Sequence, residues 1–137
     1  MIVDAKDQIF GRMANFAAKK ALLGENIDII NCEKAVITGS RHYIIRKYNI
    51  RRARGQPTKG PFLPRRPDLF VRRAVRGMLP RKKERGKIAY SRIKCHIGAP
   101  EKLTGKIFKP EKAHISKLPS LKYMYVEELC KLLGARW

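Results

Sequence analysis

The chain has 137 residues, a mass of 15.8 kDa and 44% hydrophobic residues, which fits one domain with a modest core. Its 32 Lys and Arg against 11 Asp and Glu give a net charge of +21, far more than solubility requires, and this indicates a polyanionic partner. No apolar run approaches the roughly 18 residues of a membrane span, and acidic residues stand where a signal peptide would be basic. We therefore expect a single domain over residues 1–137 that is made and used in the cytoplasm.

The basic residues are concentrated in the middle of the chain. Residues 1–40 hold five Lys or Arg and five Asp or Glu, residues 41–87 hold seventeen against two, and residues 88–137 hold ten against four. A neutral first third followed by a strongly basic middle is expected when one part builds a scaffold and another contacts phosphate.

The first third predicts a strand, a helix and two further strands. The apolar run "MIVDA" ends in polar residues, and "IFGRMANFAAKKALLG" places apolar side chains at helical spacing before a stop at Gly24. "NIDIIN" and "KAVITGS" are short runs rich in β-branched residues. Strand, helix and strand in close succession form a βαβ unit, so we expect parallel strands joined by a right-handed crossover.

The basic middle opens with a predicted helix and continues in a loop. Ser40 can cap a helix through "RHYIIRKYNIRRARG". Apolar and basic side chains of this helix fall on opposite sides, with Ile44, Ile45 and Tyr48 against Arg46, Lys47 and Arg54. The next stretch, "GQPTKGPFLPRRP", holds four prolines and two glycines, so residues 55–67 are expected to form an extended loop. Its basic residues, Lys59, Arg65 and Arg66, favour a binding role over a passive linker.

A second basic helix is predicted from Pro67, with Asp68 in its first turn and a stop at Pro80. Its apolar residues gather on one side (Phe70, Val71, Ala74, Val75 and Met78), and Arg72, Arg73 and Arg76 gather on the other. The apolar side is expected to dock on the sheet and so to direct the cations outward. A basic turn with Arg81, Lys82, Lys83 and Arg85 follows.

The rest of the chain predicts less regular structure. "KIAYSRI" predicts one or two helical turns, and "IKCHIG" predicts a further strand of the sheet. The segment after Gly98 lacks a sustained period and is expected to be irregular up to "VEELCKLLG", which restores helical spacing before Gly134. The prediction is a small α/β domain whose irregular C-terminal region, residues 99–137, ends in a helix.

Nucleic acid is the partner that the basic segment favours. Residues 41–87 contain so few acids that an ordinary solvated face is the weaker interpretation, and Arg outnumbers Lys there, which suits forked contact with phosphate. No zinc spacing, zipper or helix-turn-helix indicates DNA, and loops rich in Pro, Gly and Arg suit folded RNA better than a uniform duplex. DNA stays an alternative, and a membrane surface is a weaker one because no Trp lies on the basic helix.

Other chemistry has less support in the sequence. "ITGS" lacks the glycine spacing of phosphate-binding loops and indicates a strand-to-helix cap. Five acidic residues of the first third could bind Mg²⁺ in an RNA-processing enzyme, but their spread matches helix ends and strand edges: Asp4, Asp7, Glu25, Asp28 and Glu33. The three histidines lack a nucleophile or ligand partner, and the three separated cysteines are expected to be reduced and structural. We predict no catalytic residue, metal, cofactor or small-molecule substrate.

Two long segments resemble one known family. "DAKDQIFGRMANFAAKKALLGENIDIINCEKAVITG", then "RRP" and "AVRGMLPRKKERGKIAYSRIKCHIGAP", closely resemble the large-subunit ribosomal proteins of the family numbered thirteen, in its archaeal and eukaryotic form. The resemblance runs from about Ile2 to Pro100, and "RGMLPRKKERG" is close to a family signature. The chain begins almost directly with the first strand, without the longer leader of bacterial members, and this favours an archaeal source.

The resemblance implies both a fold and a role. The fold is a three-layer α/β/α arrangement around a small parallel sheet of about four strands, with basic loop extensions. The role is structural: binding large-subunit rRNA beside neighbouring ribosomal proteins, with support of subunit assembly and no catalysis. A free regulatory RNA binder that acts outside the ribosome stays compatible with the same residues. The RNA-binding residues that we predict are Arg46, Lys47, Arg51, Arg52, Arg54, Lys59, Arg65, Arg66, Arg72, Arg73, Arg76, Arg81, Lys82, Lys83 and Arg85.

Overall fold

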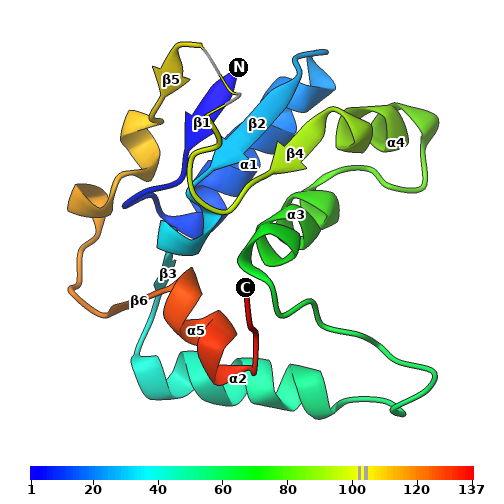
Figure 1. The fold of residues 1–137 in the computed structure, drawn as a ribbon, viewed down its shortest axis with the longest axis vertical. Coiled ribbons are helices and arrows are strands. Elements are labelled where there is room, and N and C mark those ends of the chain that lie inside the picture. Colours follow the sequence, from blue (N-terminus) through cyan, green and yellow to red (C-terminus); the bar gives the residue numbers. More distant parts are fainter. Residues whose placement is uncertain (102, 104) are drawn as a thin grey trace.

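The structure, a computed structural model, describes residues 1–101, 103 and 105–137 (Figure 1). Its strands are β1 (Ile2–Asp4), β2 (Ile27–Ile30), β3 (Val36–Thr38), β4 (Ile93–Cys95), β5 (Ile107–Phe108) and β6 (Tyr123–Tyr125). Its α-helices are α1 (Phe10–Leu22), α2 (Arg41–Ala53), α3 (Pro67–Met78), α4 (Glu84–Ser91) and α5 (Val126–Leu132). Three short 3₁₀ turns complete the described elements: η1 (Cys32–Lys34), η2 (Glu111–Ala113) and η3 (Ile115–Lys117).

The main sheet is parallel and has the strand order β4-β2-β1-β5. The strands β1 and β2, joined by α1, pair in parallel as the βαβ pattern predicts. With the helices around it, this four-stranded sheet confirms the α/β class and agrees with a three-layer arrangement.

The sequence did not predict the pairing of two strands. The run "KAVITGS" does form β3, but β3 pairs antiparallel with β6 in a separate two-stranded sheet. The C-terminal region is more regular than its sequence suggests, because it supplies both β6 and the edge strand β5. Two or three residues are too few to show alternation, so pairing with distant strands creates these elements.

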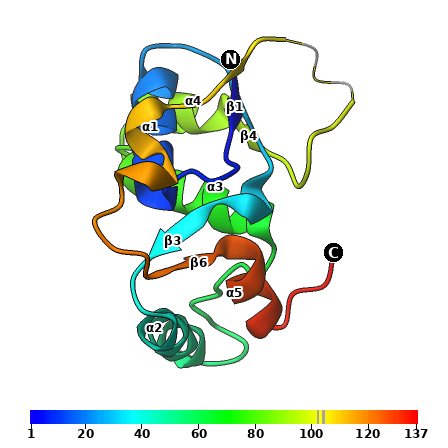
Figure 2. The same ribbon diagram turned by 90° about the vertical axis from the view of Figure 1, so that its left-hand side faces the viewer.

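One face of the main sheet carries the core. Val3, Ile27, Ile29 and Ile93 are fully buried on this face, beneath α1, α3 and α4 (Figure 2). The buried side of α1 consists of Met13 and small alanines, which allow close packing against the sheet and against α3. The core thus holds the basic helix α3 in a fixed orientation.

The helices agree with prediction except at their edges. Ser40 takes the N-cap position of α2, but its side chain makes no capping hydrogen bond. Met78 was expected on the buried side of α3 and is 44% exposed, because α3 ends at this residue and the chain turns away. The helix α4 begins at Glu84, so Arg85 lies on a helix and not in the preceding turn.

The three cysteines are free thiols, as expected. Cys32 and Cys130 are buried. The neighbouring Cys95 thiol, together with burial, raises the pKa of Cys32, and burial followed by the charge of Asp68 raises the pKa of Cys130 to about 12. Both thiols are therefore protonated at neutral pH and act as packing groups.

On the second face of the sheet, a buried carboxylate of β1 pairs with a lysine that follows the edge strand β5. Asp4 is 6% exposed and accepts hydrogen bonds from Asn31 Nδ2 at 2.8 Å and from the Lys6 backbone N–H at 3.0 Å. Lys109 Nζ, directly after β5, lies 3.1 Å from the other carboxylate oxygen. Burial raises the pKa of Asp4, but these donors outweigh it and hold the pKa below its ordinary value of 3.8.

We expect Asp4→Asn to make the protein less stable and less sensitive to acid. A lowered folded-state pKa contributes stability that is complete above the ordinary value of 3.8 and is lost as the pH falls through the folded value. At pH 7 the substitution should lower the free energy of unfolding by about 1 to 3 kcal/mol, the range for a hydrogen-bonded charge. Urea unfolding between pH 7 and pH 2.5 measures the free energy of unfolding of both proteins. If the two free energies change with pH in parallel, this would contradict a lowered pKa of Asp4 in the folded protein.

Candidate nucleic-acid interface

The helix α3 is the centre of the predicted interface. Phe70, Val71 and Val75 are buried and dock the helix on the core. The Phe70 ring lies between two others, 5.3 Å from Phe10 of α1 and 5.2 Å from Tyr48 of α2, measured between ring centroids. This row of rings connects three helices, so the positions of the cations on α2 and α3 are fixed relative to each other.

Several predicted cations have structural partners. Arg72 Cζ lies 4.7 Å from the centroid of the Tyr90 ring, and its Nε is buried without a hydrogen-bond partner in the described structure. Arg73 Nη1 donates to the Phe62 carbonyl at 2.6 Å and so attaches the 55–67 loop to α3. Arg66 binds Asp68 through two nitrogens, at 3.2 and 3.0 Å. The arginine side of α3 is therefore only partly available to a ligand.

Arg72 is a structural residue by this geometry. We expect Arg72→Gln to lower the free energy of unfolding by about 1 to 2 kcal/mol, because a partly desolvated guanidinium on an aromatic ring is lost. Arg76→Gln is the control, since the Arg76 side chain makes no polar contact in the described structure and its loss should change stability by less than about 0.5 kcal/mol. Equal stability losses in urea unfolding would contradict the distinction.

The turn between α3 and α4 projects a compact group of cations. Pro80 prevents continuation of α3, and the backbone closes through Lys83 N–H to the Pro80 carbonyl at 2.9 Å. Gly86 allows this turn, because a Cβ at Gly86 would overlap the Pro80 carbonyl oxygen. The four cations that result are exposed: Arg81, Lys82, Lys83 and Arg85.

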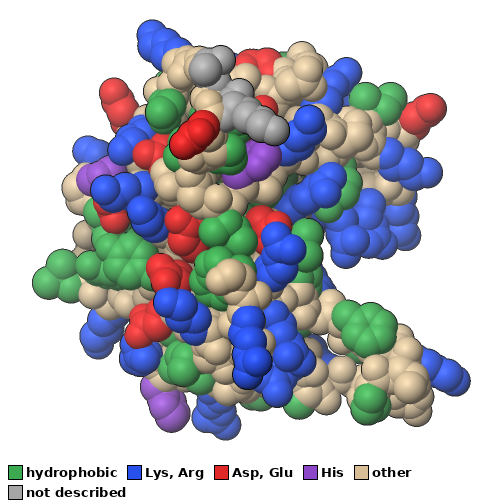
Figure 3. All heavy atoms as spheres, viewed as in Figure 1, with side chains coloured by type: hydrophobic (Ala, Val, Ile, Leu, Met, Phe, Trp, Pro, Cys, Tyr) green, Lys and Arg blue, Asp and Glu red, His purple; other side chains and the backbone are tan. Residues whose placement is uncertain are grey.

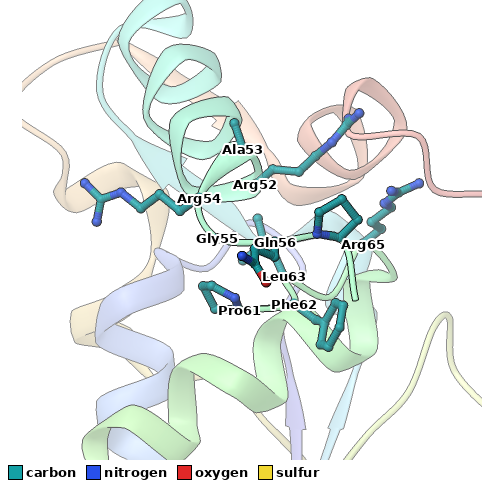
Figure 4. Close-up of a pocket in the computed structure, with 10 residues that line it drawn as sticks. Arg52, Ala53, Arg54, Gly55, Gln56, Pro61, Phe62, Leu63 and Arg65 are labelled. Carbon is teal, nitrogen blue, oxygen red and sulfur yellow. The ribbon is translucent and has the colours of Figure 1, made fainter. Parts of the chain in front are cut away.

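The end of α2 and the loop after it form the other side of the interface. Gln56 and Gly60 exchange backbone hydrogen bonds at the tip of the loop. In Figure 4, Arg54 points to one side of the loop, and Arg52 and Arg65 point to the other. Arg52 donates to the Leu133 carbonyl at 3.2 Å, which ties α2 to the C-terminal helix. The remaining predicted cations of this side are exposed: Arg46, Lys47, Arg51 and Lys59.

The predicted residues separate into an engaged set and a free set. Within the described residues, the side chains of nine predicted cations have no hydrogen bond, ion pair or stacked ring: Arg46, Arg54, Lys59, Arg65, Arg76, Arg81, Lys82, Lys83 and Arg85. The space-filling view shows Lys and Arg gathered below α4, across a notch from the 55–67 loop (Figure 3). Unpaired cations on both sides of a recess can contact two stretches of a polyanion at once.

The sequence did not reveal the cleft at the centre of this surface. A cavity of about 400 Å³ lies between α2, α3 and the loop, with Phe10, Tyr48 and Phe70 among its lining residues. Arg51, Arg54 and Arg73 also line it, and it has no acidic lining residue. The only indication in the sequence was that Tyr48 and Phe70 lie on the apolar sides of α2 and α3. This pattern does not show that the apolar sides of the two helices face each other.

The acidic residues that could have formed a magnesium site have separate partners. Asp28 Oδ1 lies 3.1 Å from His96 Nε2, Glu25 pairs with Lys20 at 2.9 Å, and Glu33 accepts the Gly98 N–H at 3.1 Å. Across residues 1–101, 103 and 105–137, no three His, Cys, Asp or Glu side chains form a group that could hold a metal ion. In the same residues, no helix has the length and hydropathy to cross a membrane.

Comparison with known proteins gives one consistent result. Residues 1–102 match the family "Ribosomal protein L13". A protein of Methanopyrus kandleri named large ribosomal subunit protein uL13 is 44% identical over 136 residues, which cover 97% of this chain and 86% of the relative. Proteins of the same name from Archaeoglobus fulgidus and Methanococcus maripaludis are each 42% identical, covering 98% and 100% of this chain and 88% and 99% of the relatives.

Proposed function

Because the chain belongs to the ribosomal protein L13 family, we propose that it is a structural constituent of the large ribosomal subunit that binds large-subunit rRNA. It is located in the large ribosomal subunit in the cytoplasm, and its partners are rRNA and neighbouring ribosomal proteins. The family role is structural, and the protein uses no cofactor or small-molecule substrate. The observation that carries the RNA contact is the set of unpaired cations on both sides of the central cleft.

Different groups of cations have different roles in RNA binding. The turn after α3 and the end of α2 with its loop neutralise phosphates of RNA segments that would otherwise repel one another. Release of condensed counterions drives this binding, and phosphate contacts fix position without reading sequence, so recognition depends on RNA shape. Arg72, Arg73 and Arg66 contribute mainly by holding helix and loop in place.

The whole of residues 1–137 acts as one domain in this proposal. The support is that α5 packs beneath η1 and α3 with Val126, Leu129 and Cys130 buried. Arg41 of α2 pairs with Glu128 of α5. The C-terminal region therefore helps to position the basic helix α2.

The test is direct binding of the purified chain to transcribed large-subunit rRNA at several salt concentrations. We expect tight binding, and the logarithm of the association constant should fall linearly with the logarithm of the salt concentration. Duplex DNA at the same total phosphate concentration should compete only weakly. Equal competition by duplex DNA would show a nonspecific polyanion binder. No binding at low salt would remove the proposal.

A further inference from the structure

We propose that the cleft between α2, α3 and the 55–67 loop receives an unpaired nucleobase of the rRNA, an inference that rests on the proposed function. The cavity of about 400 Å³ falls within the usual range of small-ligand sites, roughly 300 to 1,000 Å³. It therefore has room for a planar group to enter.

The lining of the cleft matches a nucleotide in chemistry. Phe10, Tyr48 and Phe70 line it as three tilted rings in a row. Phe70 is buried, so the half-buried rings of Phe10 and Tyr48 are the ones on which a base that leaves its helix can stack. Arg51 lies over the Tyr48 ring at 5.5 Å from its centroid, in a position where a guanidinium can stack on a base or bind its phosphate.

The charge around the cleft favours RNA over a protein segment as the occupant. Arg51, Arg54 and Arg73 line it, and the lining includes no carboxylate to offset them. A neutral apolar peptide would leave three guanidinium groups close together without compensation, whereas a nucleotide brings a phosphate with each base.

Gly77 provides an independent observation at the edge of the cleft. It lies in the last turn of α3 and lines the cavity, and a Cβ at this position would meet no atom of the described structure within 4 Å. Glycine in a helix is less favourable than alanine by roughly 0.5–1 kcal/mol, so the fold itself gains nothing from it. A glycine is useful here if another molecule approaches the helix backbone closely, which a nucleotide in the cleft would do.

Gly77→Leu is the test, because it narrows the cleft without changing charge, and its Cβ meets no atom of the described structure within 4 Å. We expect its thermal midpoint to be at least that of the wild type and its affinity for large-subunit rRNA to fall about tenfold, the order of a lost base stack. Asn15→Leu is the matched control: it adds the same side chain at an exposed helix position that lines none of the described cavities. Ala74→Leu, also in the cleft, serves as a second variant if Gly77→Leu does not fold.

Chemical probing of the bound rRNA separates the outcomes. Dimethyl sulfate and carbodiimide modification should reveal at least one unpaired base that is protected by the wild type and Asn15→Leu and stays reactive with Gly77→Leu. Unchanged affinity and protection in Gly77→Leu would overturn the inference and leave the proposed function intact. If Gly77→Leu crosslinks less than the wild type to a neighbouring ribosomal protein, while the reactivity of the rRNA bases is the same with both, the inference is overturned and the occupant of the cleft is a protein. Failure of the wild type to bind rRNA would instead remove the proposed function.

Discussion

Replacing the four cations of the turn after α3 with glutamine is expected to weaken rRNA binding by on the order of a hundredfold at about 0.15 M salt. Arg81, Lys82, Lys83 and Arg85 are exposed and have no polar side-chain partner in the described structure, so their charges are available to phosphate. The slope of log affinity against log salt should become shallower by about 0.7 to 0.9 for each contact that is lost. Filter binding over a series of salt concentrations measures both quantities.

The control for this variant removes the same charge elsewhere. Lys19, Lys112, Lys117 and Lys122 are exposed and lie outside the basic segment, and replacing them with glutamine gives the same net charge. If binding depends on where the charges lie, the control should keep most of its affinity and its salt slope. Equal losses in the two variants would mean that total charge, and not this surface, determines binding.

Phe70→Ala is expected to cause the largest loss of stability, about 3 to 5 kcal/mol in the free energy of unfolding. Phe70 is 4% exposed, and its ring contacts Phe10 and Tyr48, so its removal leaves a cavity where α1, α2 and α3 meet. Urea unfolding followed by circular dichroism measures the loss. Binding of rRNA should weaken as well, because the cations of α2 and α3 lose their common support.

Leu69→Ala is the neighbouring control for the aromatic core. Leu69 is 45% exposed, so its truncation should change the free energy of unfolding by less than about 0.5 kcal/mol. A small effect at Phe70, comparable with that at Leu69, would contradict the packing of the three helices around this ring.

The sequence predicted the helices better than the sheet partners. The twelve residues of α3 show a full helical pattern with Pro67 at the start and Pro80 after the end, so local signals determine its bounds and most of its buried side, Met78 excepted. The strand β5 has two residues and exists because it pairs with Ile2 and Val3 about a hundred positions earlier. Such pairing depends on tertiary structure, which a periodicity analysis of short segments cannot detect.

The same limit applies to the candidate interface. Composition and helical spacing identified the basic segment and the outward side of α3, but not which cations are free. Arg72 is engaged because Tyr90, eighteen positions away, packs beneath it, and Arg73 is engaged because the loop returns to α3 at Phe62. The aromatic cleft requires three helices to meet, so no single segment of the sequence indicates it.

Sedimentation of a cell extract through a density gradient tests the central claim most directly. The chain is traced by mass spectrometry across the gradient at low salt and again after a high-salt wash. We predict that it travels with the large ribosomal subunit and is released only at high salt, as binding through many phosphate contacts requires. Recovery at the top of the gradient with free proteins, at low salt, would contradict its role as a structural constituent of the subunit.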